Sequence, residues 1–305
     1  MRAGAPLLFT LLAACDHTSA PADAAVDLPV AEELGPATYT FVLDAGVLPP
    51  ASFPSVLVYV PARFHVVKPL RAVIWLHGNG NCVSNVIRDL DSECTPDAGT
   101  RSAHHLATQL ETSQQNALLI VLELGYDDGI AAGNLANAGG MRALLAETLA
   151  DLRPYLGVVR VDDLAPLVVA SHSAGYVAAA PIVSVGGVPV GEVWHFDSLY
   201  GEITEFTNWI AANLHSFEGS PPACRLVDIY THAGGTEANS VNLAETAEQD
   251  WLPDAGAVID DRTLGDLSDD QLRHGLIFEL SPLSHNDVAR TWFVRLLSTA
   301  DQRLR

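Results

Sequence analysis

The sequence predicts an α/β fold in which a mostly parallel sheet is covered by helices on both faces. Short apolar runs alternate with helix-like segments along the chain, and strands that alternate with helices form parallel sheets. Several runs are apolar at every position, as in strands that are buried on both faces. Composition agrees, because 305 residues with 49% hydrophobic and 17% charged residues can bury the core of one large domain.

Eight of the apolar runs are expected to be strands. The first two have no helix between them and should pair as an antiparallel edge. The expected strands are residues 39–43, 56–60, 72–76, 118–122, 167–170, 193–196, 226–230 and 276–280. The expected helices are residues 102–114, 140–156, 174–183, 204–215, 239–250 and 286–303.

Acidic residues dominate the charge of the chain. The sequence holds 16 basic and 37 acidic residues, a formal net charge of −21, which repels nucleic acid and anionic lipid headgroups. We therefore expect no nucleic-acid partner. No Cys-x-x-Cys pair is present, and Gly78 and Gly80 lack the third glycine of a dinucleotide-binding loop. We expect neither a metal nor a cofactor.

The N-terminus resembles a bacterial lipoprotein signal. Met1 and Arg2 form a short positive region, and an apolar stretch leads to Leu-Ala-Ala-Cys, in which Cys15 is the expected lipidation site. This predicts export and a lipid anchor on a bacterial membrane, at its periplasmic or cell-surface face. The alternatives are a plain secretory signal with a chance cysteine or an uncleaved anchor. The expected parts are a signal peptide over 1–14, a lipidated cysteine and flexible tether over 15–36, and one folded domain over 37–305.

Export would place the other cysteines in an oxidising compartment, where thiols pair. Cys82 and Cys94 lie twelve residues apart in a loop-like stretch, so we expect a disulfide that stiffens the mouth of any adjacent site. Cys224 opens an expected strand and is expected to be buried and free.

Residues 171–175, with the sequence Ser-His-Ser-Ala-Gly, follow an expected strand and lead into an expected helix. A nucleophile elbow has this pattern: a sharp turn presents the central serine above the sheet, and small residues flank it because strand and helix nearly touch. Ser173 is therefore the candidate nucleophile, with Ser171 in place of the usual first glycine. We expect His172 to point away from the site and to be structural.

A glycine-bearing loop, His-Gly-Asn-Gly-Asn, follows the expected strand 72–76. Acyl transfer requires N–H donors for a developing oxyanion. The candidate donors are the backbone N–H of Asn79 or Gly80 and that of Ala174, which follows the serine.

The candidate base is His285, in a Ser-His-Asn-Asp sequence after the last expected strand. A serine hydroxyl needs an imidazole to take its proton, and a carboxylate then fixes the imidazole tautomer. Two carboxylates suit that role. We favour Asp197, which ends an apolar strand, over Glu237 in the Gly-Gly-Thr-Glu loop.

With oxyanion loop, elbow, acid and histidine in this order, the chain resembles the α/β-hydrolase superfamily over roughly residues 54–300. It is similar to secreted or lipoprotein hydrolases with a His-Ser-Ala-Gly-Tyr elbow, an Asp-x-Leu-Tyr-Gly turn and a later Gly-Gly-Thr loop. Here these are residues 172–176, 197–201 and 234–236. The resemblance implies a doubly wound sheet and acyl-transfer chemistry, with no particular substrate.

The hypothesis from the sequence is a cofactor-independent serine hydrolase that acts on carboxylic esters. A small-molecule ester or acyl compound is the expected substrate. A peptidase or cell-envelope amidase with the same triad is one alternative, and a catalytically inactive binding lipoprotein is another.

Overall fold

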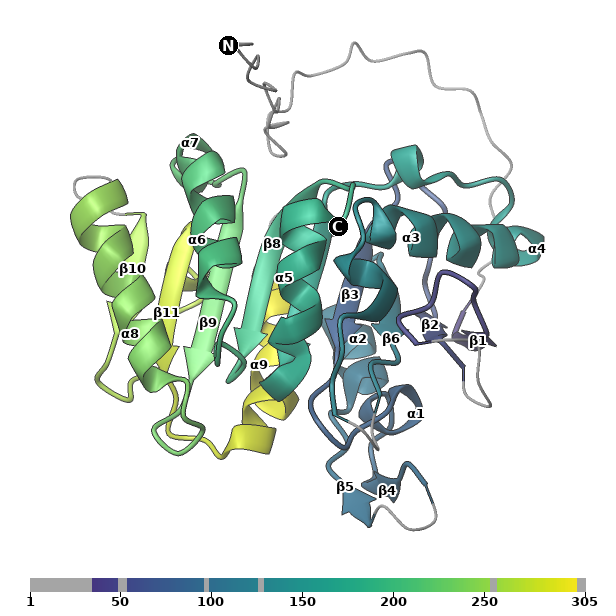
Figure 1. The fold of residues 1–305 in the computed structure, drawn as a ribbon, viewed down its shortest axis with the longest axis horizontal. Helices are drawn as coiled ribbons and strands as arrows, with labels where there is room; N and C mark the ends of the chain where they lie inside the picture. The colour runs from purple at the N-terminus through teal and green to yellow at the C-terminus, as the bar shows by residue number, and fades with distance from the viewer. Residues whose placement is uncertain (1–34, 49–53, 96–98, 126–128, 253–256, 301–305) are drawn as a thin grey trace, which may run out of the picture.

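A nine-stranded sheet lies at the centre of the computed structural model, which describes residues 35–48, 54–95, 99–125, 129–252 and 257–300 (Figure 1). Its strands follow the order β1-β2-β6-β3-β7-β8-β9-β11-β10. The strands are β1 (Ala37–Phe41), β2 (Val56–Val60), β3 (Ala72–Leu76), β6 (Leu118–Leu122), β7 (Leu167–His172), β8 (Val190–Phe196), β9 (Arg225–Tyr230), β10 (Val258–Asp261) and β11 (Leu276–Leu280).

The sheet is mostly parallel. β2 pairs antiparallel with both β1 and β6, and the strands from β6 to β10 run parallel to one another. The expected antiparallel edge and all eight expected strands are present, within a few residues at their ends. β10 is an additional edge strand that the sequence did not predict. The predicted α/β class is confirmed.

Helices cover both faces of the sheet, so the apolar residues of the strands from β2 to β11 are buried in one of two apolar clusters, whereas the edge strands β1 and β10 are only partly buried. α3, α5, α6 and α8 pack on one face, and α2 and α9 on the other (Figure 1). The expected helix over 140–156 is two helices that meet at Leu152, and that over 204–215 is also two. The helices are α1 (Val83–Val86), α2 (Leu106–Ser113), α3 (Gly140–Asp151), α4 (Arg153–Leu156), α5 (Tyr176–Val185), α6 (Ile203–Ala212), α7 (Leu214–Phe217), α8 (Glu237–Thr246) and α9 (His285–Thr299).

A small hairpin of β4 (Ser92–Glu93) and β5 (Thr100–Arg101) lies outside the sheet, beyond α1 (Figure 1). A disulfide between Cys82 and Cys94 ties this hairpin to the loop after β3, which confirms the predicted pairing. Cys224 is buried as expected, but it is disulfide-bonded and not free. That part of the prediction is wrong, because spacing between cysteines in the sequence does not give their distances in the fold.

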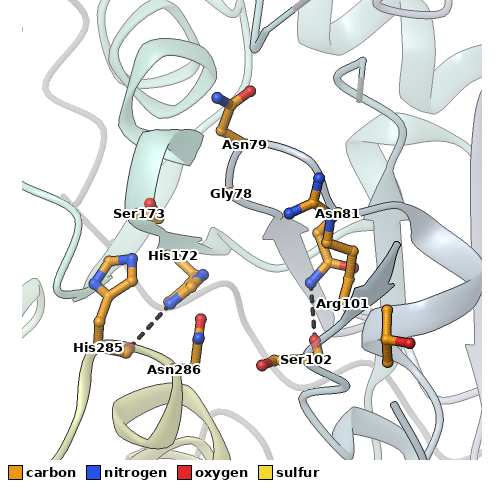
Figure 2. A pocket seen from close by; sticks show the side chains of 10 residues that line it. Gly78, Asn79, Asn81, Arg101, Ser102, His172, Ser173, His285 and Asn286 are labelled. Carbon is orange, nitrogen blue, oxygen red and sulfur yellow. Dashed lines mark hydrogen bonds between the residues drawn. The ribbon is translucent and has the colours of Figure 1, made fainter. Parts of the chain in front are cut away.

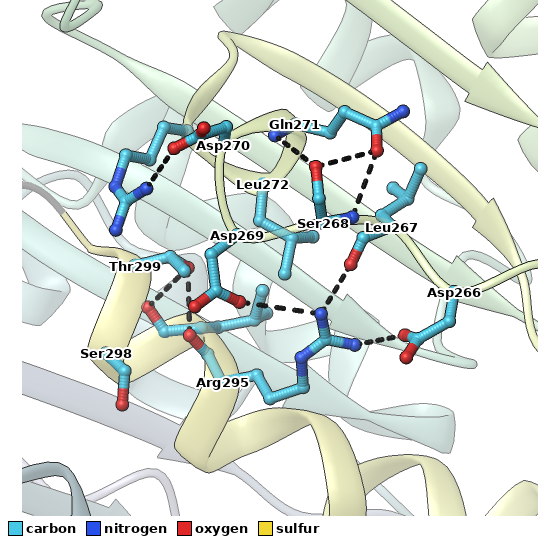
Figure 3. A network of polar contacts seen from close by, with 12 residues as sticks. Asp266, Leu267, Ser268, Asp269, Asp270, Gln271, Leu272, Arg295, Ser298 and Thr299 are labelled. Atoms are coloured by element: carbon cyan, nitrogen blue, oxygen red, sulfur yellow. Dashed lines mark hydrogen bonds and ion pairs between the residues drawn. The ribbon is translucent and has the colours of Figure 1, made fainter.

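α9 is fixed to its surroundings along its length. Gln109 of α2 donates to the Ala289 carbonyl and accepts from the Val294 N–H. Near its end, Arg295 binds Asp266 and the Leu267 carbonyl (Figure 3). These contacts fix the position of His285, the first residue of this helix.

A buried ion pair joins two neighbouring strands. Arg225 of β9 binds Glu192 of β8 at 2.6 Å, and each side chain is about 4–5% exposed. Trp194 also donates to Glu192 at 2.9 Å, while Arg225 donates to the carbonyl of Leu272 at 2.6 Å. The pair therefore has the additional hydrogen bonds that a buried charge needs.

The expected signal peptide over 1–14, Cys15 and nearly all of the expected tether lie outside the described residues. Within the described residues, no helix has the length and the apolar character that crossing a membrane requires.

We predict that Arg225→Met lowers the free energy of unfolding by about 3–5 kcal/mol, because it leaves the Glu192 carboxylate buried without a counter-ion. Urea unfolding followed by circular dichroism measures this loss. Arg142→Met is the matched control, because it breaks the solvent-exposed pair with Asp162 and should cost less than about 1 kcal/mol. Equal losses in the two variants would contradict the prediction.

Candidate active site

Ser173 lies at a tight turn between β7 and α5. Its φ is 53°, a left-handed conformation that is strained for a residue with a Cβ. A Cβ on Gly175 would lie 2.4 Å from the Leu76 carbonyl oxygen, so the turn passes β3 at a distance that only glycine permits. Ser171, at the position where the elbow pattern has its first glycine, is fully buried.

His285 and Asp197 are in direct contact. The Nδ1 atom of His285 lies 2.7 Å from Oδ2 of Asp197, so the imidazole N–H donates to a buried carboxylate. Asp197 directly follows β8 and has a φ of 48°. His285 opens α9, so the contact joins residues that are 88 positions apart in the chain.

Other hydrogen bonds hold the Asp197 carboxylate. It accepts from the Thr231 hydroxyl at 2.8 Å, from the Thr231 N–H at 3.2 Å and from the Thr236 hydroxyl. Burial raises the pKa of Asp197, but the hydrogen bonds from His285, Thr236 and Thr231 outweigh burial and hold it below its usual value. A Cβ on Gly234 would lie 2.0 Å from Asp197 Oδ2, so this loop approaches the carboxylate only because residue 234 is glycine.

Glu237, the alternative acid, lies elsewhere. It is the first residue of α8, and its carboxylate is 2.9 Å from Nδ1 of His232 in an exposed ion pair. The structure thus brings Asp197, and not Glu237, to His285. The Gly-Gly-Thr-Glu loop contributes Gly234 and Thr236 to the site. Both residues belong to the sequence pattern, but the pattern gave no sign that they contact Asp197.

Ser173 and His285 face a common polar pocket of about 250 Å³ (Figure 2). The Ser173 hydroxyl makes no hydrogen bond within the described residues, and contacts of this kind are often incomplete in a site without substrate. The remaining lining residues come from the loop after β3, from β5 and the residue after it, from the end of β7 and from the start of α9. The pocket is lined by Gly78, Asn79, Asn81, Thr100, Arg101, Ser102, His172, Ser173, His285 and Asn286.

The loop after β3 passes close to the serine. A Cβ on Gly78 would lie 2.6 Å from Ser173 Cβ, so the next residue, Asn79, borders the same pocket. The backbone N–H of Asn79 donates no hydrogen bond within the described part of the chain. Ala174 follows the serine on the turn, whereas Gly80 is buried and turned toward Arg101. Of the two loop donors considered, the geometry therefore favours Asn79.

His172 supports His285, contrary to the expectation that it points away. Its Nε2 donates to the His285 carbonyl at 3.1 Å, and the two ring centroids are 4.6 Å apart (Figure 2). Burial, followed by the charge of His285, lowers the pKa of His172 to about 3. His172 is therefore neutral at ordinary pH and holds the backbone of the His285 loop.

Solved structures resemble this arrangement of strands and helices. A feruloyl esterase module from Clostridium thermocellum, complexed with sinapinate, matches with a TM-score of 0.56 and 12% identity over 92% of this chain and 96% of that one. A structure described as FAE matches with a TM-score of 0.51 and 10% identity over the same shares. The chain has the α/β-hydrolase fold. No protein-family model and no curated protein matches the sequence.

The α/β-hydrolase fold accounts for the order of the three central residues. In this fold a serine, an acidic residue and a histidine follow one another along the chain, as Ser173, Asp197 and His285 do. They sit after β7, β8 and β11, at the carboxyl edge of the sheet. Among the residues described, no cluster of three or more His, Cys, Asp or Glu is arranged to hold a metal.

A row of buried polar side chains lies behind the elbow. Ser171, His195 and Asp228 occupy matching positions on three neighbouring strands, and all three are fully buried. Burial lowers the pKa of His195 to about 3. Burial, with a smaller effect of the Asp197 charge, raises the pKa of Asp228 to about 7. Sequence reasoning missed this row because each residue lies singly within an otherwise apolar strand.

We predict that Asp228→Asn stabilises the protein, relative to wild type, by an amount that grows as the pH rises. Between pH 4 and pH 7 the unfolded state has lost the Asp228 proton, while the folded state keeps it until its pKa of about 7. The wild type therefore loses up to about 1.4 kcal/mol per pH unit over this window, and the amide does not. Urea unfolding at pH 5 and pH 8 measures the difference.

Asp151→Asn removes an exposed carboxylate of α3 and serves as the control, with the same offset from wild type expected at both pH values. A pH-independent offset for Asp228→Asn as well would contradict the prediction.

Proposed function

We propose that the protein is a serine hydrolase that cleaves carboxylic esters through an acyl-enzyme. Ser173 Oγ attacks the ester carbonyl carbon while His285 Nε2 accepts the hydroxyl proton. The N–H groups of Asn79 and Ala174 stabilise the oxyanion of the tetrahedral intermediate. His285 then gives its proton to the departing alcohol, and water, activated by the same imidazole, releases the acid.

The observation that carries this proposal is the contact between His285 Nδ1 and the buried Asp197 carboxylate, next to a strained serine. A carboxylate held ionised at Nδ1 leaves Nε2 unprotonated, which is the form that can accept the serine proton. Asp197 then stabilises the imidazolium that forms. The feruloyl esterase module that shares the fold favours an ester as the substrate class.

Fluorophosphonate labelling of the full chain tests the proposal. We expect the wild type to label, Ser173→Ala not to label, and His285→Ala and Asp197→Asn to label at least about a hundredfold more slowly. Glu237→Gln is the matched control, because it removes the carboxylate at the start of α8, which pairs with His232 and not with His285; its labelling rate should stay near that of wild type.

A folded wild-type protein that does not label would overturn the proposal and favour a binding protein without catalytic activity. Labelled protein that cleaves peptides but no esters would point to an amidase or peptidase using the same residues.

We also propose that the chain is exported and anchored by a lipid on Cys15. The signal-like N-terminus supports this, and so does the Cys82–Cys94 disulfide, because disulfides persist in oxidising compartments. Cys15 is, however, the only cysteine in the sequence left to pair with Cys224 within one chain. One thiol cannot carry both a lipid and a disulfide.

Mass spectrometry of the purified full-length product, before and after reduction, distinguishes the two states of Cys15. We expect an N-terminal peptide that starts at Cys15 and carries acyl chains, and a Cys15→Ala variant that is released from membranes. A peptide in which Cys15 is linked to Cys224 would overturn the lipid anchor.

A further inference from the structure

Arg101 places a guanidinium at the pocket that Ser173 and His285 face (Figure 2). It is the second residue of β5, on the hairpin that the Cys82–Cys94 disulfide holds against the loop after β3. Within the described residues its side chain forms no hydrogen bond and no ion pair. An arginine without a partner at the wall of a polar pocket is available to an anionic group of a substrate.

Among the described residues, the acidic side chains close to the hairpin, Asp91 and Glu93, form no ion pair with Arg101. Asp91 is bound by Arg290. Glu93 pairs with Thr100 across the hairpin, and because neighbouring strand residues point to opposite faces, it lies on the face away from Arg101. In a chain with a formal charge of −21, this pocket wall is therefore a local positive site within a negative surrounding field.

The guanidinium lies against the loop after β3. An ideal Cβ on Gly80 would lie 2.9 Å from Arg101 Cζ, so the guanidinium rests on the backbone of the candidate oxyanion loop. Asn81 donates to the carbonyl of Ser102, the residue after Arg101, at 2.9 Å. The backbone beside Arg101 is thus held in place, and positioning a binding group in advance lowers the ordering cost of binding.

The pocket itself is small and polar. Its volume of about 250 Å³ lies below the range typical of drug-sized ligands. Apart from Ser173 and the imidazoles of His172 and His285, the described side chains that line it are amides, hydroxyls and the guanidinium, and none of them is apolar. A long acyl chain has no matching surface here.

We propose that Arg101 is a specificity residue that selects small esters carrying a carboxylate close to the scissile bond. This inference rests on the proposed ester hydrolysis at Ser173. The guanidinium binds the substrate carboxylate through paired hydrogen bonds, which orients the ester carbonyl toward Ser173 and the Asn79 N–H.

Matched ester pairs test this, each differing only in one charge. The first pair is 4-acetoxybenzoate and 4-acetoxybenzamide, with the charge on the leaving group. The second pair is the 4-nitrophenyl monoester of succinic acid and that of succinamic acid, with the charge on the acyl group. We expect wild type to prefer the charged member of at least one pair by about tenfold or more in kcat/KM. Higher salt should reduce this preference.

Arg101→Gln should remove the preference, because kcat/KM for the charged esters should fall by more than kcat/KM for the neutral esters, and Arg101→Lys should keep part of the preference. Arg63→Gln is the control for overall charge. Arg63 follows β2, whose end pairs with the start of β6 and so lies at the opposite edge of the sheet. The Arg63→Gln variant should prefer the charged esters as strongly as wild type does.

Each result bears on one of the two proposals. Where turnover is too slow to measure, protection of Ser173 from fluorophosphonate labelling by each ester replaces kcat/KM. Labelling without a preference for the charged esters, or a preference that persists in Arg101→Gln, overturns the specificity role and leaves the hydrolase proposal intact. Absence of labelling in folded protein overturns the hydrolase proposal, and the role of Arg101 with it.

Discussion

The hydrogen bond between His285 and Asp197 is the constraint on which the rest of the site depends. It requires a carboxylate in a fully buried place, where desolvation alone would raise its pKa. The two threonines and the imidazole compensate for the lost water, and Gly234 leaves room for the loop that brings Thr236. Parts of β8, β9, α8 and α9 are thereby fixed with respect to one another by one acidic side chain.

The same constraint explains why α9 is anchored so firmly. Because His285 is the first residue of the helix, any shift of α9 along its axis would break the contact with Asp197. The hydrogen bonds of Gln109 to the middle of α9 and those of Arg295 near the end of α9 prevent such a shift. His172 holds the backbone of His285 through a hydrogen bond to its carbonyl. The packing of α2 and α9 on their face of the sheet therefore keeps His285 in position at the carboxyl edge.

Much of the fold could be predicted from the sequence, because its strands are continuous apolar runs and its helices lie between them. β10 was missed because Val-Ile-Asp-Asp has only two apolar residues and occupies a half-buried edge. The β4–β5 hairpin was missed because two residues per strand carry no periodicity. Ser173 and His285 were identifiable from motif and order. Asp197 could be favoured over Glu237 because it follows an apolar strand, but the sequence alone does not decide between them, because the outcome depends on how the Gly-Gly-Thr loop folds back.

Arg101 carries no signal in the sequence, since an exposed arginine in a loop is common; only the disulfide-held hairpin gives it a position. That disulfide lies outside the central sheet, so forming the sheet and fixing the pocket wall are separate events. Protein made in a reducing cytosol could therefore have the full sheet, the strained serine and a normal far-ultraviolet spectrum, yet have a loose pocket wall. Two batches of equal purity would then differ in selectivity according to their redox history, and a thiol titration would be needed to tell them apart.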